Sequence, residues 1–190
     1  MHAHDVWPRK DGGGITLIPL PKCRMIRHNS PLLYLIGVNH VVQFGEPSRA
    51  TNSRIVREKR ASFKAHVLEA IEKQDIAILA EEFSEEAKVK WRVSETTLEQ
   101  FGKTKGIEYR PCDPTSIERN EKGIGESDWN KREEFWLSRI QDCKSRNVLF
   151  VCGDCHEEPF AKKLTAAGFD VRHAPTCWRI SDYESVVSDP

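Results

Sequence analysis

Three short, unbroken apolar runs constrain the fold of this chain more than any other feature. They are LLYLIG at residues 32–37, DIAILAEEF at 75–83 and NVLFVCG at 147–153. Strands of a parallel sheet are buried on both faces, so they show continuous rather than alternating hydrophobicity. The segments 106–113 and 168–175 are shorter strand candidates that each begin with a helix-ending Gly. Residues 15–28 can add edge strands, because their prolines argue against a central place.

Between these runs, apolar residues recur at helical spacing and mark amphipathic helices. The residues are Val56, Phe63, Val67 and Ile71, then Trp129, Trp136, Ile140 and Cys143, and finally Phe160, Leu164 and Ala167. Residues 84–106 are expected to hold one or two more helices. Strands that alternate with helices predict an α/β fold, in which a mostly parallel central sheet is flanked by helices on both faces in three layers.

Length and charge limit the organisation and the partners. At 190 residues the chain is predicted to form a single domain over 1–190, with flexible ends at 1–14 and 181–190. Lys plus Arg balances Asp plus Glu at 29 each, so no overall field favours nucleic acid or an anionic membrane. Without a long apolar run or an apolar signal core, we expect a cytoplasmic protein with free thiols, while its oligomeric state stays open.

Two predicted strand ends have the same layout. Gly37 and Gly153 each end an apolar strand, and His40 and His156 follow them after two residues. Glu81 and Glu82 come at the end of a third strand. Ligands of open α/β sheets bind outside the carboxyl ends of the strands, so these side chains are predicted to share a pocket.

The order of these motifs resembles that of the TraB/Tiki-like superfamily, which also takes in erythromycin-esterase-like and ChaN-like proteins. The resemblance covers roughly residues 32–173 and rests on Gly37 with His40, Glu81 or Glu82, Arg132 in KREEFW, and Gly153 with His156. It implies an α/β fold with a pocket of histidines and a carboxylate. Some members use this pocket for metal-dependent peptide hydrolysis, and others for metal-independent ester hydrolysis or for haem handling.

The predicted pocket has two chemical interpretations. His40, His156 and Glu81 are a ligand set that suits a divalent transition metal, which would lower the pKa of a bound water. Without metal, one histidine can act as a general base on water, oriented by Glu81 or Glu82, while Arg132 stabilises the developing oxyanion. Both interpretations predict a hydrolase that cleaves ester or amide bonds in a small-molecule or peptide substrate.

The alternative is a non-catalytic module that binds a small ligand or a protein in the same pocket. Gln43 follows His40 closely enough to line the pocket, and Asp113 and Arg119 lie beyond another candidate strand, so these three residues are expected to support the site. Trp91, Trp129 and Trp136 lie in predicted helices, where tryptophan more often belongs to the core, and Trp136 fits the buried face of its helix.

Cys152, Cys155 and His156 also spell the C-x-x-C-H signature of covalent haem attachment. That attachment needs an oxidising export pathway and an axial partner, so we do not expect haem. A thioredoxin-like pair belongs after a first strand, and a structural zinc site needs four ligands. The remaining interpretation is that Cys152 ends a buried strand and Cys155 lies near the pocket.

Overall fold

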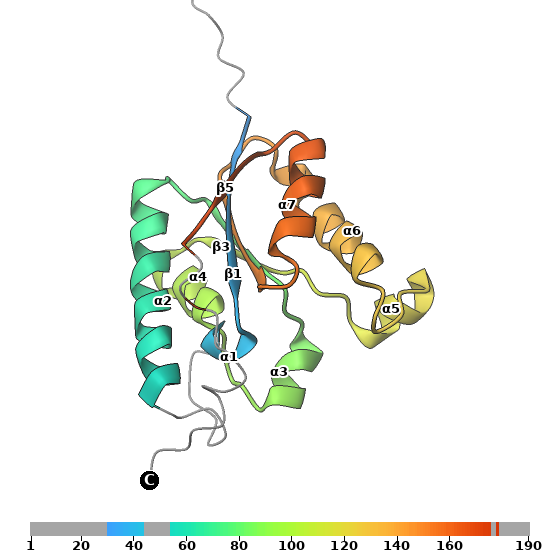
Figure 1. The fold of residues 1–190 in the computed structure, drawn as a ribbon, viewed down its shortest axis with the longest axis horizontal. Helices are drawn as coiled ribbons and strands as arrows, with labels where there is room; N and C mark the ends of the chain where they lie inside the picture. The colour runs from blue at the N-terminus through green and yellow to red at the C-terminus, as the bar shows by residue number, and fades with distance from the viewer. Residues whose placement is uncertain (1–29, 44–53, 176–177, 179–190) are drawn as a thin grey trace, which may run out of the picture.

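Among the residues that the structure describes, the central sheet has five parallel strands, in agreement with the predicted mostly parallel sheet. The computed structural model describes residues 30–43, 54–175 and 178, so the predicted flexible ends and edge strands before residue 30 lie outside the described residues. The strands follow the order β3-β2-β4-β1-β5 (Figure 1). Their bounds are Leu32–Val38 for β1, Ile78–Glu81 for β2, Glu108–Pro111 for β3, Val148–Gly153 for β4 and Asp170–His173 for β5.

Helices cover both faces of the sheet, which confirms the predicted three-layer α/β architecture. On one side lie α2 (Arg54–Lys73) and α4 (Thr97–Lys105), and on the other lie α6 (Trp129–Ile140) and α7 (Glu157–Ala166) (Figure 1). A 3₁₀ turn, Gln141–Cys143, follows α6. Three short helices gather near the carboxyl ends of the strands: α1 (His40–Gln43), α3 (Glu85–Trp91) and α5 (Ser116–Lys122).

The two hydrophobic layers explain why the strand sequences are unbroken apolar runs. Leu33 and Leu35 of β1 pack in the layer under α6 and α7, whereas Ile36 lies in the layer under α2 and α4. Strand β4 divides in the same way, with Phe150 in the first layer and Leu149 in the second. Every residue of β4 is buried, because successive side chains enter opposite layers that are both covered.

The strand order creates a crevice at the centre of the sheet. Strands β2 and β4 are neighbours, but the chain leaves β2 toward β3 at one edge and leaves β4 toward β5 at the other. Connections that diverge from adjacent strands leave an opening outside their carboxyl ends, where ligands bind in open α/β sheets. Both Glu82, which follows β2, and the second G-x-x-H motif are therefore placed at this opening.

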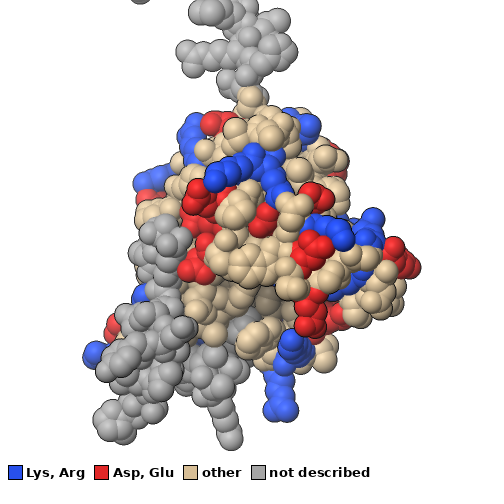
Figure 2. Space-filling view, turned by 45° about the vertical axis from the view of Figure 1, so that its right-hand side comes forward, with Lys and Arg blue, Asp and Glu red and all other residues tan. Residues whose placement is uncertain are grey.

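The surface carries charges of both signs without a separated basic or acidic face in the view of Figure 2. Lys and Arg side chains alternate there with Asp and Glu side chains, as the equal totals predict. Among the described helices, none combines the length and the hydrophobicity that crossing a bilayer requires.

Gly37 lets the first turn of α7 pack directly against β1. A Cβ atom at this position would lie 2.3 Å from Glu157 Oε2 and 3.1 Å from Glu157 Cβ. We expect Gly37→Ala to lower the free energy of unfolding by ~1–3 kcal/mol, since a buried side chain must move to admit the methyl group. Urea unfolding followed by circular dichroism measures this change.

Gly125→Ala is the matched control for that substitution. The nearest atom to its added Cβ would be Asp128 Cβ at 3.9 Å, an ordinary contact distance. We expect its unfolding midpoint to stay within error of the parent protein. Equal midpoints for Gly37→Ala and Gly125→Ala would show that the close approach of α7 to β1 is not needed.

Candidate functional site

Glu82 is the central acidic group of the crevice. It follows β2 directly and is 4% exposed. Its Oε2 accepts a 2.7 Å hydrogen bond from the backbone N–H of Gly153 at the end of β4, and its Oε1 accepts one of 2.7 Å from Nη2 of Arg132 in α6. A charged carboxylate can be buried only with such partners, so these contacts hold two strand ends and a helix together.

The two predicted histidines converge on this carboxylate. His40 Nε2 lies 3.9 Å from Glu82 Oε1, and His156 Nε2 lies 3.7 Å from the same atom. Gly153 makes room for this approach, because a Cβ there would lie 3.0 Å from His40 Nε2. The structure therefore brings together four of the residues chosen from the sequence, namely His40, Glu82, Arg132 and His156.

The second nitrogen of each imidazole is held by a neighbouring side chain. His40 Nδ1 lies 2.6 Å from Gln43 Oε1, and Gln43 Nε2 donates to Glu81 Oε2 at 3.4 Å. With the amide in this orientation, Nδ1 of neutral His40 carries the proton and Nε2 keeps its lone pair.

His156 is oriented in the same way by Glu133. Its Nδ1 lies 2.9 Å from Glu133 Oε1, and Lys163 Nζ lies 3.7 Å from the other oxygen of that carboxylate. Nε2 of a neutral His156 therefore also presents a lone pair to Glu82. The distances from the two Nε2 atoms to Glu82 Oε1, 3.9 and 3.7 Å, are longer than direct hydrogen bonds. A molecule that donates hydrogen bonds to both the nitrogen and the oxygen, such as water, fits these distances.

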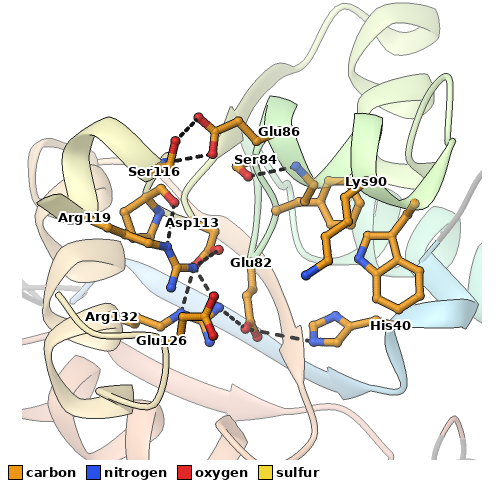
Figure 3. A pocket seen from close by; sticks show the side chains of 14 residues that line it. His40, Glu82, Ser84, Glu86, Lys90, Asp113, Ser116, Arg119, Glu126 and Arg132 are labelled. Carbon is orange, nitrogen blue, oxygen red and sulfur yellow. Dashed lines mark hydrogen bonds and ion pairs between the residues drawn. The ribbon is translucent and has the colours of Figure 1, made fainter.

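The two histidines differ in access. A cleft of about 460 Å³ opens over Glu82, and His40 forms part of its wall (Figure 3). The His40 side chain is 40% exposed, whereas His156 is 3% exposed and packs edge-on against the rings of Trp129 and Trp136 at centroid distances of 5.0 and 4.9 Å. A ligand in the cleft can reach His40, whereas His156 approaches Glu82 from the buried interior.

Glu81, predicted as a metal ligand, is not part of this group. Its Oε1 accepts hydrogen bonds from the hydroxyl groups of Thr96 and Tyr109, the second at 2.7 Å, in the layer under α4. Glu81 ends β2 and Glu82 follows it, so their side chains point to different sides of the sheet. Burial raises the pKa of Glu81 to about 7, because its hydrogen-bonding partners are neutral.

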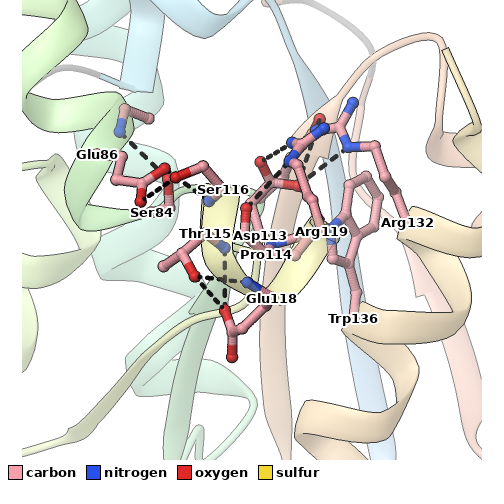
Figure 4. Close-up of polar contacts among 12 residues, drawn as sticks. Ser84, Glu86, Asp113, Pro114, Thr115, Ser116, Glu118, Arg119, Arg132 and Trp136 are labelled. Carbon is pink, nitrogen blue, oxygen red and sulfur yellow. Dashed lines mark hydrogen bonds and ion pairs between the residues drawn. The ribbon is translucent and has the colours of Figure 1, made fainter. Parts of the chain in front are cut away.

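Asp113 organises the basic side chains of the cleft. It accepts hydrogen bonds from Arg119 Nη2 at 2.8 Å, from Arg132 Nε and Nη2 at 3.1 and 2.8 Å, and from Trp136 Nε1 at 3.1 Å (Figure 4). Asp113 therefore fixes the plane of the Arg132 guanidinium beside Glu82. Nη1 of Arg132 makes no hydrogen bond with any residue that the structure describes, so it remains available to a ligand.

The metal interpretation fits the donor types but not their spacing. Two imidazoles and a carboxylate suit a divalent transition ion, and the Nδ1 partners Gln43 and Glu133 resemble those of metal-bound histidines. However, ligands at ~2.1 Å from a tetrahedral ion lie ~3.4 Å apart, whereas these atoms are 3.7 and 3.9 Å apart. No cluster of three or more His, Cys, Asp or Glu side chains with metal-holding geometry occurs within 30–43, 54–175 and 178.

The thiols of the C-x-x-C-H segment are both free. Cys152 is fully buried at the end of β4, and Cys155 is exposed in the turn that follows. Burial raises the pKa of Cys152 well above its ordinary value, which keeps the thiol protonated. The expectation that Cys152 ends a buried strand is confirmed. His156, in the same segment, directs its Nε2 toward Glu82 Oε1.

Two groups of functional residues were missed by the sequence reasoning. Glu133 lies on the buried stripe of α6, four residues after Trp129 and three before Trp136, and is 2% exposed. An acidic residue at an apolar stripe position was a usable signal for a buried ion pair. The partners of Glu81, Thr96 and Tyr109, gave no comparable signal, because each also has an ordinary place at a helix start or in a strand.

Comparison with known proteins adds no assignment. The chain matches no protein-family model, and no curated protein or solved structure shows significant similarity to it.

The raised pKa of Glu81 predicts a pH-dependent stability. The folded protein holds this proton up to about pH 7, whereas an unfolded chain releases it near 4.5. The contribution of Glu81 to stability is therefore full below pH 4.5 and falls by up to ~3 kcal/mol as the pH rises through 7. Urea unfolding between pH 5 and 8 measures the fall. We expect a smaller fall for Glu81→Gln, and parallel curves for the two proteins would contradict the assignment.

Proposed function

We propose that this protein is a hydrolase of ester or amide bonds. The proposal rests on one observation: His40 Nε2, with its tautomer set by Gln43, faces Glu82 Oε1 across 3.9 Å at the wall of a cleft that Arg132 also lines. A base, a carboxylate and a cationic hydrogen-bond donor therefore line the same cleft. The substrate proposed for this site is a small molecule or a peptide in the cytoplasm.

The arrangement supports a general-base mechanism. A water that donates hydrogen bonds to both His40 Nε2 and Glu82 Oε1 at ~2.8 Å fits the separation of these acceptors. His40 takes one proton as the water oxygen attacks the carbonyl carbon of the substrate. His40 then returns the proton to the leaving oxygen or nitrogen, which yields a carboxylic acid and an alcohol or amine.

Arg132 is placed to stabilise the charge that develops on the carbonyl oxygen. Its Nε and Nη2 are engaged by Asp113 and Glu82, so the guanidinium is fixed before a substrate arrives. Nη1 is then the donor for the oxyanion. A donor that is already oriented lowers the barrier without reorganisation during the reaction.

The sequence resemblance supports the same class of reaction. The two G-x-x-H motifs, the acidic residue after the next strand and the helical Arg132 are those that suggested a TraB/Tiki-like hydrolase. In the metal-dependent form of this proposal, His40, Glu82 and His156 would hold a divalent transition ion that polarises water. The general-base form needs no change in their spacing and is therefore preferred.

A non-catalytic binding module is the alternative. Glu82 already accepts hydrogen bonds at both oxygens, from Arg132 and from Gly153, so the pocket is stable without a reacting partner. Such a module would bind its ligand in the same cleft. Binding without turnover in the purified protein would favour this function.

Replacement of His40 tests the proposed base. We expect His40→Ala to lower kcat/KM for an activated ester such as 4-nitrophenyl acetate by about 10²–10⁴-fold, the usual contribution of general-base catalysis. Stopped-flow or steady-state release of 4-nitrophenolate measures the rate. His66→Gln is the matched control, since His66 lies on α2 and pairs with Tyr34 away from the cleft. Equal losses in both variants, or none in either, would refute the role of His40.

Chelation tests the role of metal. We expect ester hydrolysis by protein purified without a histidine tag to survive dialysis against EDTA, because the proposed proton transfers use only protein groups. Elemental analysis of the same sample gives the metal content. Loss of activity that added zinc or manganese restores, together with a stoichiometric ion that is absent from His156→Ala, would replace the general-base mechanism with the metal-dependent one.

A further inference from the structure

Two lysines of α3 have different surroundings. Lys88 is buried and pairs with Glu85 and Glu99, at 2.7 and 2.9 Å. Lys90, two residues later, is exposed and lines the cleft. Its ammonium group makes no hydrogen bond or ion pair with any part of the chain that the structure describes. In Figure 3 it extends into the cleft on the side of His40 and Glu82.

That Lys90 has no partner among the described residues has a structural cause. Glu86 precedes Lys90 by four residues, the spacing at which Glu and Lys pair on a helix. Instead, the Glu86 carboxylate crosses the cleft to α5 and accepts hydrogen bonds from the N–H and hydroxyl of Ser116 at 2.7 and 2.8 Å (Figure 4). The helical neighbour that would neutralise Lys90 is thus used to join α3 to α5.

The other cations of the cleft are already neutralised. Arg119 pairs with Asp113, and Arg132 pairs with Asp113 and Glu82. Lys90 is therefore the cation of this cleft with no partner among the described residues. A ligand that brings an anionic group gains an ion pair at Lys90 without breaking an internal one.

Apolar surface lies beside this charge. Phe83, Ala87, Trp91 and Pro114 also line the cleft. Trp91, Trp129 and Trp136 were all expected in the core. The expectation is confirmed for Trp136, which is fully buried, and is wrong for Trp91 and Trp129, which are 46% and 49% exposed. Helix α3 ends at Trp91, and the exposed Trp91 side chain lines the cleft.

We propose that the cleft selects substrates that carry a single carboxylate, held by Lys90, next to an apolar group that packs against Trp91. The proposal deepens the proposed hydrolase, since it names the class of ester or amide that the site accepts. A monoanion is favoured over a phosphate dianion, because Lys90 is one cation without a partner among the described residues, in a cleft that also contains Glu82, Glu86, Asp113 and Glu126.

Binding measurements test this subsite independently of turnover. Calorimetric or NMR titration with 4-phenylbutyrate and its neutral analogue 4-phenylbutanamide isolates the contribution of the carboxylate. We expect the acid to bind about five- to tenfold more tightly than the amide. Lys90→Met should remove this difference, and Lys90→Arg should retain most of it. Phenyl phosphate should bind less tightly than the carboxylate, and tighter binding would overturn the choice of a monoanion.

Lys144→Met is the matched control. Lys144 is exposed and precedes β4, at the opposite end of the sheet from the cleft. We expect the preference for the acid to be unchanged in this variant. Equal affinities for acid and amide in the parent protein, or a preference that persists in Lys90→Met, would overturn the proposal.

Hydrolysis of matched esters separates the two proposals. We expect kcat/KM for the 4-nitrophenyl monoester of glutaric acid to exceed that for 4-nitrophenyl butyrate about fivefold, and Lys90→Glu to reverse the preference. Carboxylate binding at Lys90 without hydrolysis of either ester would refute the proposed hydrolase, while the proposed carboxylate subsite would stand. Hydrolysis through His40 without a preference for the anionic ester would refute the subsite and leave the hydrolase.

Discussion

The buried carboxylate of Glu82 is the constraint on which the site depends. A charge that is 4% exposed must be compensated inside the protein, and Gly153 N–H and Arg132 supply the compensation. Each partner comes from a different element, so the carboxylate fixes the relative positions of β2, β4 and α6. The place where a substrate can react is thus set by the same contacts that make the buried acid tolerable.

Two adjacent glutamates have different surroundings, because at the end of β2 their side chains point to opposite sides of the sheet. Glu82 is held by a guanidinium and a backbone N–H, whereas the partners of Glu81 are two hydroxyl groups and an amide. Burial raises the pKa of Glu81 to about 7, so this side chain can hold a proton near neutral pH. Gln43 links the two sides, since its amide contacts both Glu81 and His40. The orientation of the His40 imidazole thereby depends on a carboxylate that no ligand in the cleft touches.

The sequence predicted the architecture because short, continuous apolar runs between amphipathic helices are typical of strands covered on both faces. It also predicted that His40, His156 and an acidic residue would meet, since strand ends of a parallel sheet share one edge, whereas Arg132 of α6 was expected there only from the family resemblance. It chose Glu81 as the metal ligand and kept both Glu81 and Glu82 as candidate carboxylates, whereas Glu82 is the one beside the histidines. The correct choice depends on the last paired residue of β2, and such boundaries are not encoded in hydrophobicity. Helices α1 and α5 were missed because four and seven residues are too few to show a period.

The cleft combines two kinds of charge. Most of the charges form ion pairs within the protein, which holds the reactive groups in place in the absence of a ligand. These paired residues are Glu82, Asp113, Arg119 and Arg132. No residue that the structure describes compensates Lys90 in this way, because Glu86 is engaged by Ser116. Fixed pairs suit catalysis, since their geometry is set in advance, whereas an unpaired charge suits recognition, since only a ligand completes it. The contact that joins α3 to α5 therefore shapes the cleft and leaves Lys90 without a partner in the described part of the chain, where a substrate can supply one.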